Sequence, residues 1–265
     1  DISEYDLALA DYTSALSIPD ASAYGKCRAI NNRANVYETT GDIELAIKEY
    51  SIIIDDYPEE VLSTNYRNRG SSYESLEQYD LALLDYNQAV ELDPGEARNY
   101  RYRADLYALL EENSKAFLDY SKCIELYPNS AYYLNNRGDF HRDISEYDLA
   151  LADYTSALSI PDASAYGKCR AINNRANVYD DTGDIELAIK EYSIIIDDYA
   201  DALDFDDLAT SYRNRGWSYE SLEQYDLALL DYNQAVELDP GKASNYEYRA
   251  DLYALLEENS KAFLD

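Results

Sequence analysis

A long internal repeat constrains this chain more than any other feature. The segment DISEYDLALADY at Asp1 returns at Asp143, 142 residues later. From Tyr66 and Tyr212 onward the offset becomes 146, because PEEVLSTN in the first copy is replaced by the longer ADALDFDDLATS in the second. Self-similarity at a fixed offset is typical of repeat architectures. We therefore expect two blocks, residues 1–142 and a truncated 143–265, within one continuous stack of repeats.

A shorter repeat lies inside each block and is marked by an alanine in strings such as YDLALADY and IELAIKEY. Successive marker alanines are 38, 36, 34, 34, 38, 40 and 34 residues apart, so the base unit is 34 residues with small insertions. That period is typical of a helix-turn-helix repeat. The markers are Ala8, Ala46, Ala82, Ala116, Ala150, Ala188, Ala228 and Ala262.

Each unit is predicted to contain two helices. The first helix, as in SNYEYRADLYALLEEN, places Tyr246, Ala250 and Tyr253 at helical i, i+4, i+7 spacing. The second follows a Ser, Asp or Asn capping candidate and ends before a proline in the regular units, as at Pro94 and Pro240. Block 1 begins at a second helix, and Ala262 is expected to lie in another.

The residue order within a unit resembles the tetratricopeptide repeat, and the resemblance covers essentially the whole chain. The unit at Ala97 supplies the family pattern with Tyr100, Ala104, Tyr107, Ala116, Tyr120, Cys123 and Pro128. The resemblance implies an all-α fold, a right-handed superhelical α-solenoid of antiparallel helix pairs. It also implies that first helices line a concave groove and that second helices form the convex back. His141 departs from the pattern, because other units have Tyr there.

An arginine in the first helix is followed sixteen residues later by an acid in the second, seven times along the chain. Guanidinium and carboxylate groups match in a bidentate geometry, so we interpret these residues as structural pairs that join the helices of each hairpin. The pairs are Arg33 with Glu49, Arg69 with Asp85, Arg103 with Asp119, Arg137 with Asp153, Arg175 with Glu191, Arg215 with Asp231 and Arg249 with Asp265.

Other arginines also fall only in predicted first helices. The resemblance therefore implies a groove with local positive charge, which would suit an acidic peptide or the acidic back of another copy. The alternative is that these arginines are solvated helix positions. They are Arg28, Arg67, Arg98, Arg101, Arg142, Arg170 and Arg213.

Outside the insertion the two blocks differ at six positions, and five of them are first-helix positions that face the groove in the family. This clustering favours groove positions tuned to different contacts, with Trp217 as a candidate interface anchor. The differences are Glu38/Asp180, Thr39/Asp181, Ser71/Trp217, Glu96/Lys242, Arg98/Ser244 and Arg101/Glu247. The predicted partner-binding residues are Arg28, Asn31, Asn35, Arg67, Ser71, Arg98, Arg101, Asn135, Asp139, Arg170, Asn173, Asn177, Arg213, Trp217, Ser244 and Glu247.

Composition argues against several function classes. A formal charge of −31 repels nucleic acid and anionic membranes, and no segment approaches the apolar length of a membrane span. No Gly-rich phosphate loop or hydrolase motif is present, and the sole histidine sits at a core position, so we expect neither catalysis nor a cofactor. The three cysteines lack metal-ligand spacing, and the acidic segment 201–207 lacks EF-hand order, so we expect no metal.

Two functions follow from the resemblance and from the near-identity of the blocks. The first is a non-enzymatic scaffold whose concave groove binds a protein or peptide. The second is a structural protein that self-associates, end to end or groove to back, into a superhelical filament or surface fibre. The family's carboxylate-clamp pattern is not matched, because Asn31 replaces its Lys and Tyr102 replaces a basic residue. The compartment would be cytoplasmic by family default, or extracellular or cell-surface for a filament.

Overall fold

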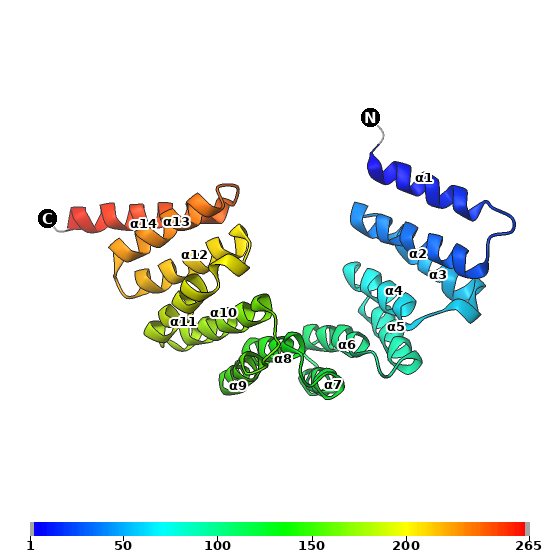
Figure 1. Cartoon of the computed structure of the whole chain (residues 1–265), viewed down its shortest axis with the longest axis horizontal. Helices are drawn as coiled ribbons and strands as arrows, with labels where there is room; N and C mark the ends of the chain where they lie inside the picture. The colour runs from blue at the N-terminus through cyan, green and yellow to red at the C-terminus, as the bar shows by residue number, and fades with distance from the viewer. Residues whose placement is uncertain (1–2, 263–265) are drawn as a thin grey trace. The chain divides into compact units, whose positions relative to one another are not determined.

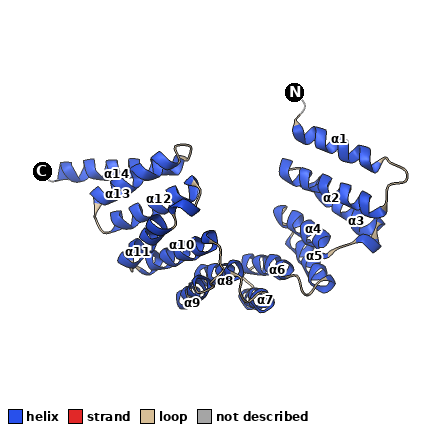
Figure 2. Cartoon of the chain, viewed as in Figure 1, coloured by secondary structure: helices blue, strands red, loops and turns tan. Residues whose placement is uncertain are grey.

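The structure, a computed structural model, describes residues 3–262 and is built of helices over that range (Figures 1 and 2). It divides into two compact units, residues 1–128 and 129–265, which are described separately. No helix in the described part of the chain is long and apolar enough to cross a membrane.

The first unit stacks a leading helix and three helical hairpins. The hairpins are α2–α3, α4–α5 and α6–α7, and α1 packs on α2 (Figure 1). The bounds are α1 Glu4–Leu16, α2 Ala23–Thr40, α3 Ile43–Asp56, the 3-10 helix η1 Pro58–Glu60, α4 Ser63–Ser75, α5 Tyr79–Leu92, α6 Ala97–Leu109 and α7 Asn113–Leu126.

The second unit stacks three hairpins and a final helix. The hairpins are α8–α9, α10–α11 and α12–α13, and α14 packs on α12 and α13. The bounds are α8 Ala131–Asp143, α9 Tyr147–Leu158, α10 Ala165–Thr182, α11 Ile185–Asp198, the 3-10 helix η2 Ala200–Ala202, α12 Phe205–Ser221, α13 Tyr225–Leu238 and α14 Ala243–Ala262. The four-residue insertion of the second block lengthens α12 to 17 residues, against 13 in the equivalent α4, which is about one helical turn.

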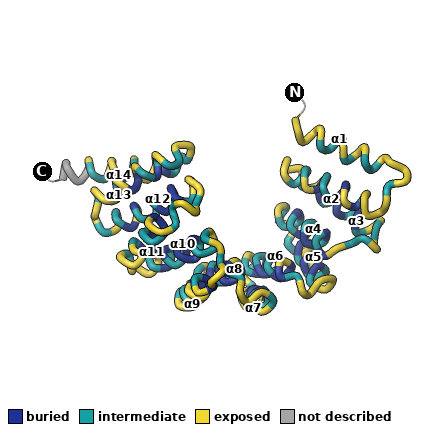
Figure 3. Tube along the Cα trace, viewed as in Figure 1, coloured by how far each residue is buried: buried dark blue, intermediate teal, exposed yellow. Residues whose placement is uncertain are grey.

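The core of each hairpin is formed where a small residue of the first helix meets a tyrosine of the second. Tyr232 and Ala228 of α13 are fully buried against Gly216 of α12. A Cβ atom at Gly216 would lie 2.7 Å from the Tyr232 ring, so the close approach of the helices requires glycine there. Buried positions consequently follow the inner sides of the hairpins, and exposed ones follow the outer sides and turns (Figure 3).

The turns inside the hairpins use left-handed residues. Gly41 and Gly183 have φ of 85°, and Glu77, Glu111 and Ser145 have φ of 57°, 58° and 62°. A left-handed residue ends the first helix and returns the chain antiparallel to it. No atom lies within 4 Å of the position that a Cβ atom would occupy at Gly41 or Gly183. The positive φ alone therefore favours glycine in these two turns.

The structure bears on the predicted fold class and on the predicted last helix. The predicted α-solenoid fold class is confirmed, but the prediction that Ala262 lies in a separate second helix is wrong, because α14 runs through the position that corresponds to the turn at Glu111. A non-glycine residue in the left-handed region costs about 1–2 kcal/mol, and a helix that continues through this position avoids that cost. The two blocks 1–142 and 143–265 of one continuous solenoid stay a prediction, and the compact units divide after residue 128.

Candidate protein-binding face

Six of the seven arginine–acid pairs are hydrogen-bonded, five of them through Nε and Nη2 together, whereas in Arg175–Glu191 Nη2 alone donates to both carboxylate oxygens. In Arg215–Asp231, for example, Nε and Nη2 donate to the two carboxylate oxygens over 2.8 Å each. The others are Arg33–Glu49, Arg69–Asp85, Arg103–Asp119, Arg137–Asp153 and Arg175–Glu191. Asp265, the predicted partner of Arg249, lies outside the described residues. These arginines therefore hold hairpins together.

At least five of the seven predicted arginines, Arg249 included, make a further contact that sequence reasoning missed. Their Nη1 atom donates to a hydroxyl or amide oxygen on the preceding second helix, at 2.8 to 3.2 Å. Each acceptor directly follows a tyrosine of that helix, which is the sequence signal that could have revealed it. The contacts are Arg33 to Thr13, Arg69 to Ser51, Arg103 to Asn87, Arg215 to Ser193 and Arg249 to Asn233.

Burial and charge act in opposite directions on these guanidinium groups. Burial would lower the pKa of Arg215, but the hydrogen bond and charge of Asp231 outweigh burial and raise that pKa. Arg69 and Arg103 show the same balance with Asp85 and Asp119. These three guanidinium groups therefore stay charged inside the fold.

Most of the arginines predicted to line the groove also bind acceptors of their own chain. In the first unit, Arg67 is buried and donates to Asn99 Oδ1 over 2.9 Å. Arg98 pairs with Glu96 at 2.8 Å, and the Arg101 pair with Asp105 is 2.5 Å long.

The second unit repeats this behaviour with different acceptors. Arg170 pairs with Asp139 at 2.6 Å, and Arg213 donates to Ser244 Oγ and Asn245 Oδ1 over 3.2 and 3.1 Å. Arg28 is exposed. An acidic ligand would compete with internal acceptors for nearly all of these guanidinium groups, so the contacts give the acidic-partner expectation little support.

Several other predicted groove residues have structural contacts. Asn35 and Asn177 accept hydrogen bonds from Tyr50 and Tyr192 over 2.7 and 2.6 Å. Asn135 is fully buried and donates to the Gly167 carbonyl. The remaining predicted residues Asn31, Ser71, Asn173, Ser244 and Glu247 are half-buried or exposed on first helices.

The first helices of the second unit, together with Tyr192 of α11, line an open pocket of about 360 Å³. Arg142 of α8, Asp180 and Asp181 of α10, Trp217 of α12 and Tyr248 of α14 contribute to its wall. The exposed fractions are 43% for Trp217 and 38% for Tyr248, which is high for large aromatic residues. Trp217, Asn177 and Arg142 were predicted to lie in the groove, and Asp180 and Asp181 were among the differences between the blocks, whereas Tyr248 was not predicted.

One wall of the pocket carries its carboxylates in two different states of solvation. Asp180 is half-buried and accepts hydrogen bonds from Ser218 over 2.9 Å and from Tyr192 over 3.0 Å. Burial raises the Asp180 pKa above its ordinary value of 3.8, although the two hydrogen bonds oppose that rise. Asp181 is exposed. This wall of the pocket is therefore acidic, and hydrogen bonds from Ser218 and Tyr192 hold Asp180 in place.

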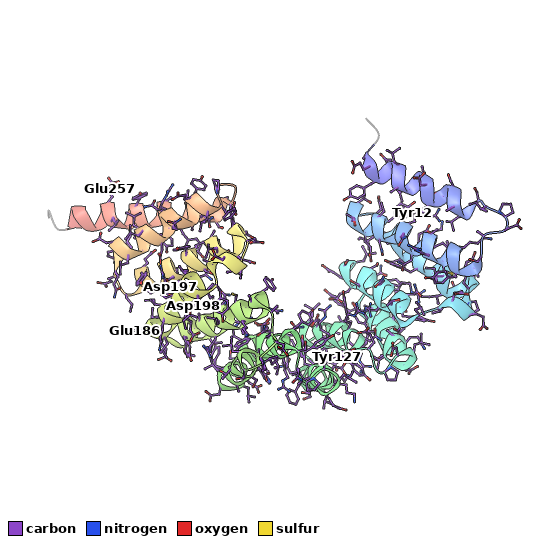
Figure 4. The ribbon with its side chains drawn as sticks, viewed as in Figure 1. Tyr12, Tyr127, Glu186, Asp197, Asp198 and Glu257 are labelled. Atoms are coloured by element: carbon purple, nitrogen blue, oxygen red, sulfur yellow. The ribbon has the colours of Figure 1, made fainter. Side chains whose placement is uncertain are left out.

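The opposite surface, formed by second helices, carries exposed acids and exposed leucines. Glu186, Asp197 and Asp198 are exposed on α11 (Figure 4). Leu187 of α11 and Leu227 of α13 are 44% and 42% exposed at equivalent positions. Neither set belongs to the pocket.

The sole histidine and the cysteines occupy the interior. His141 is buried, with Nδ1 2.8 Å from Glu146 Oε2. Cys27, Cys123 and Cys169 are free and buried. Within the described residues, no group of three or more His, Cys, Asp or Glu side chains is arranged to hold a metal ion.

Comparison with known proteins identifies the repeat. The family model for the tetratricopeptide repeat matches residues 66–96 and 209–242, two units at equivalent places in the two blocks. The chain is a tetratricopeptide-repeat protein. The family's repeats are associated with protein–protein interaction, which is the coarse function that this membership indicates.

Curated relatives share only part of this repeat protein. It is 34% identical over 88 residues to small glutamine-rich tetratricopeptide repeat-containing protein 2 of Saccharomyces cerevisiae, covering 31% of this chain and 24% of the relative. It is 35% identical over 78 residues to the human mitochondrial import receptor subunit TOM70, covering 28% of this chain and 13% of the relative. The matched segment thus spans about a quarter or less of these relatives.

Solved structures resemble the tetratricopeptide-repeat chain over nearly its whole length. A tetratricopeptide repeat protein from Parabacteroides merdae aligns with a TM-score of 0.67 at 20% identity, covering 94% of this chain and 93% of that one. The C-terminal part of a repeat-containing protein from Cytophaga hutchinsonii gives a TM-score of 0.63 at 18% identity, with 92% and 94% covered. At these identities the likeness shows the fold alone.

Proposed function

We propose that this tetratricopeptide-repeat protein is a non-enzymatic scaffold that binds a partner protein on the face formed by its first helices. The observation that carries the proposal is the pocket around Trp217, where a large aromatic side chain stays exposed among polar and charged neighbours. Interface hot spots combine an aromatic anchor with a surrounding polar rim. One of the relatives is named as an import receptor subunit, which supports a binding role.

The experiment selects peptides from a displayed random library on the immobilised chain and measures their affinity by calorimetry. Trp217→Ser is the test variant, because serine is the natural residue at the equivalent Ser71 and the fold accepts it there. Leu187→Ser combined with Leu227→Ser is the matched control on the second helices. We expect Trp217→Ser to weaken binding about tenfold or more, and the control to leave binding unchanged.

The reverse pattern would contradict the proposal. Peptides that tolerate Trp217→Ser but not the leucine control would place the binding face on the second helices.

Self-association is a second candidate function, and the exposed leucines on the second helices favour it. A leucine directly before the marker alanine is exposed in α3, α5, α9, α11 and α13, and a recurring apolar position on an outer surface suits contact with another copy. Analytical ultracentrifugation of wild type and the leucine double variant tests this candidate. Assemblies that survive the double variant, or a wild type that stays monomeric at high concentration, would contradict it.

A further inference from the structure

Tyr102 of the first block and Tyr248 of the second block occupy equivalent positions, but the residues beside them differ. In the first unit, the guanidinium carbon of Arg101 lies 3.9 Å from the centre of the Tyr102 ring. The same guanidinium pairs with Asp105. A cation over an aromatic face is attracted by the ring quadrupole. Tyr102 therefore already holds a cation that belongs to its own chain.

In the second unit the equivalent tyrosine, Tyr248, has lost that cation. Glu247 stands where Arg101 stands, and Asp251 corresponds to Asp105, so an ion pair is replaced by two carboxylates one turn apart on α14. Both acids are exposed. Arg213 lies 5.7 Å from the Tyr248 ring, as Arg67 does from Tyr102, so this second arginine is common to both units. Beside this tyrosine, the units therefore differ by the replacement of Arg101 with Glu247.

Other block differences change the pocket in the same direction. Thr39 becomes Asp181, Ser71 becomes Trp217 and Arg98 becomes Ser244. Across the six differing positions, block one has two carboxylates and two guanidinium groups, whereas block two has three carboxylates and one ammonium group. The ammonium group, on Lys242, is paired with Asp206. The second unit thus gains an aromatic surface and negative charge where the first has its own cations.

From this contrast we infer that the pocket of the second unit binds a lysine or arginine side chain from a basic segment of a partner protein. Trp217 and Tyr248 supply aromatic faces, and Asp180 and Asp181 supply carboxylates on the adjacent wall. A partly desolvated cation gains from both kinds of contact. The inference rests on the proposed function and names the chemistry of its ligand.

The rest of the molecule suits a basic ligand better than an acidic one. The lining carries one cation, Arg142, which lies 3.5 Å from Asp143. The formal charge of −31 attracts a basic partner at long range and repels an acidic one. The pocket is open and has a volume of about 360 Å³, which leaves room for a side chain that stays partly exposed to solvent.

The test uses Trp217 as its own reporter, because it is the only tryptophan in the chain. Three versions of one neutral Gly-Ser peptide, carrying Lys, norleucine or Glu at the same positions, are titrated to millimolar concentration while Trp emission is recorded. We expect a saturable change with the Lys version alone, weakening as ionic strength rises.

Matched variants separate local recognition from bulk charge. Asp181→Thr with Glu247→Arg restores the residues of the first block and keeps Trp217, whereas Glu186→Arg with Asp197→Thr makes the same charge change on exposed positions of α11. We expect the first variant to lose about tenfold or more in affinity for the Lys peptide. The second should lose no more than long-range attraction accounts for.

Three outcomes would overturn the inference: no response to the Lys peptide, equal losses in the two charge variants, or a norleucine or Glu peptide that binds as tightly as the Lys peptide. If selected peptides depend on Trp217 but are acidic or neutral and indifferent to Asp181→Thr with Glu247→Arg, the inference fails while the proposed function stands. If no selected peptide depends on Trp217, the proposed function itself fails.

Discussion

Removing Arg215 from its buried pair should destabilise the second unit strongly. Its guanidinium donates to both oxygens of Asp231 and to Ser193 on the preceding second helix. The Asp231 side chain is 7% exposed and that of Arg215 is 15% exposed, so water cannot replace the lost partner. In Arg215→Met, a buried carboxylate is left without its cation.

The expected magnitude follows from that burial. Loss of one partner of a buried pair costs about 3–5 kcal/mol, out of a total stability of about 5–15 kcal/mol for a typical domain. The double variant Arg215→Met with Asp231→Leu removes both charges and should recover most of the loss, because an apolar pair of similar volume satisfies the same space. The deficit left in the double variant should be about 1 kcal/mol, from the lost hydrogen bond between Arg215 and Ser193.

Urea unfolding followed by Trp217 emission measures these differences, because the reporter lies on the same helix as Arg215. Solenoid stability is a sum over neighbouring repeats, so the Trp217 signal is treated as the transition of its own repeats. Arg28→Met, at an exposed first-helix position, is the control and should change the midpoint little. A single variant that loses less than about 1 kcal/mol, or a double variant as unstable as the single one, would refute the reasoning.

Two further predictions concern thiols and turns. Burial raises the pKa of Cys169 to about 11 and that of Cys123 to about 12, so both thiols stay protonated at pH 8, and iodoacetamide should modify them only after denaturation. Rapid alkylation of the folded chain would contradict this. Gly183→Ala should cost about 1 kcal/mol in urea midpoints, and Gly183→Asn less, because the strain lies in φ and nothing lies within 4 Å of the new Cβ. Equal losses from Ala and Asn would indicate a steric cause instead.

The sequence was sufficient to predict the helical pairs and the contacts that recur at a fixed spacing. The sixteen-residue offset between Arg69 and Asp85 is set by one hairpin, so any unit with the same turn places the two side chains together. The contact from Arg69 to Ser51 was not predicted, because it depends on how one hairpin packs on the one before it. Periodicity within a unit contains no information about that packing.

The character of the candidate site was harder to predict. Counting arginines on first helices suggested a positively charged groove, but Arg67, Arg101 and Arg170 bind acceptors of their own chain. Whether a charge is available depends on the side chains that the fold places beside it, and net composition does not contain that information. Trp217 was recognised because it differs between two otherwise matching blocks, whereas Tyr248 was not, because it is identical to Tyr102 and only its neighbours differ.

The arginine–acid pair of each hairpin also bears on how such a chain can grow. Arg137 belongs to block 1–142 and its partner Asp153 to block 143–265, so the border between the blocks falls inside one pair. A block duplicated whole by recombination would carry the acid of a pair near its start and the arginine of a pair near its end, so the pair at the new border could form with residues already present. Duplication of the gene segment would then need no compensating mutation at the seam, in keeping with two blocks that remain nearly identical.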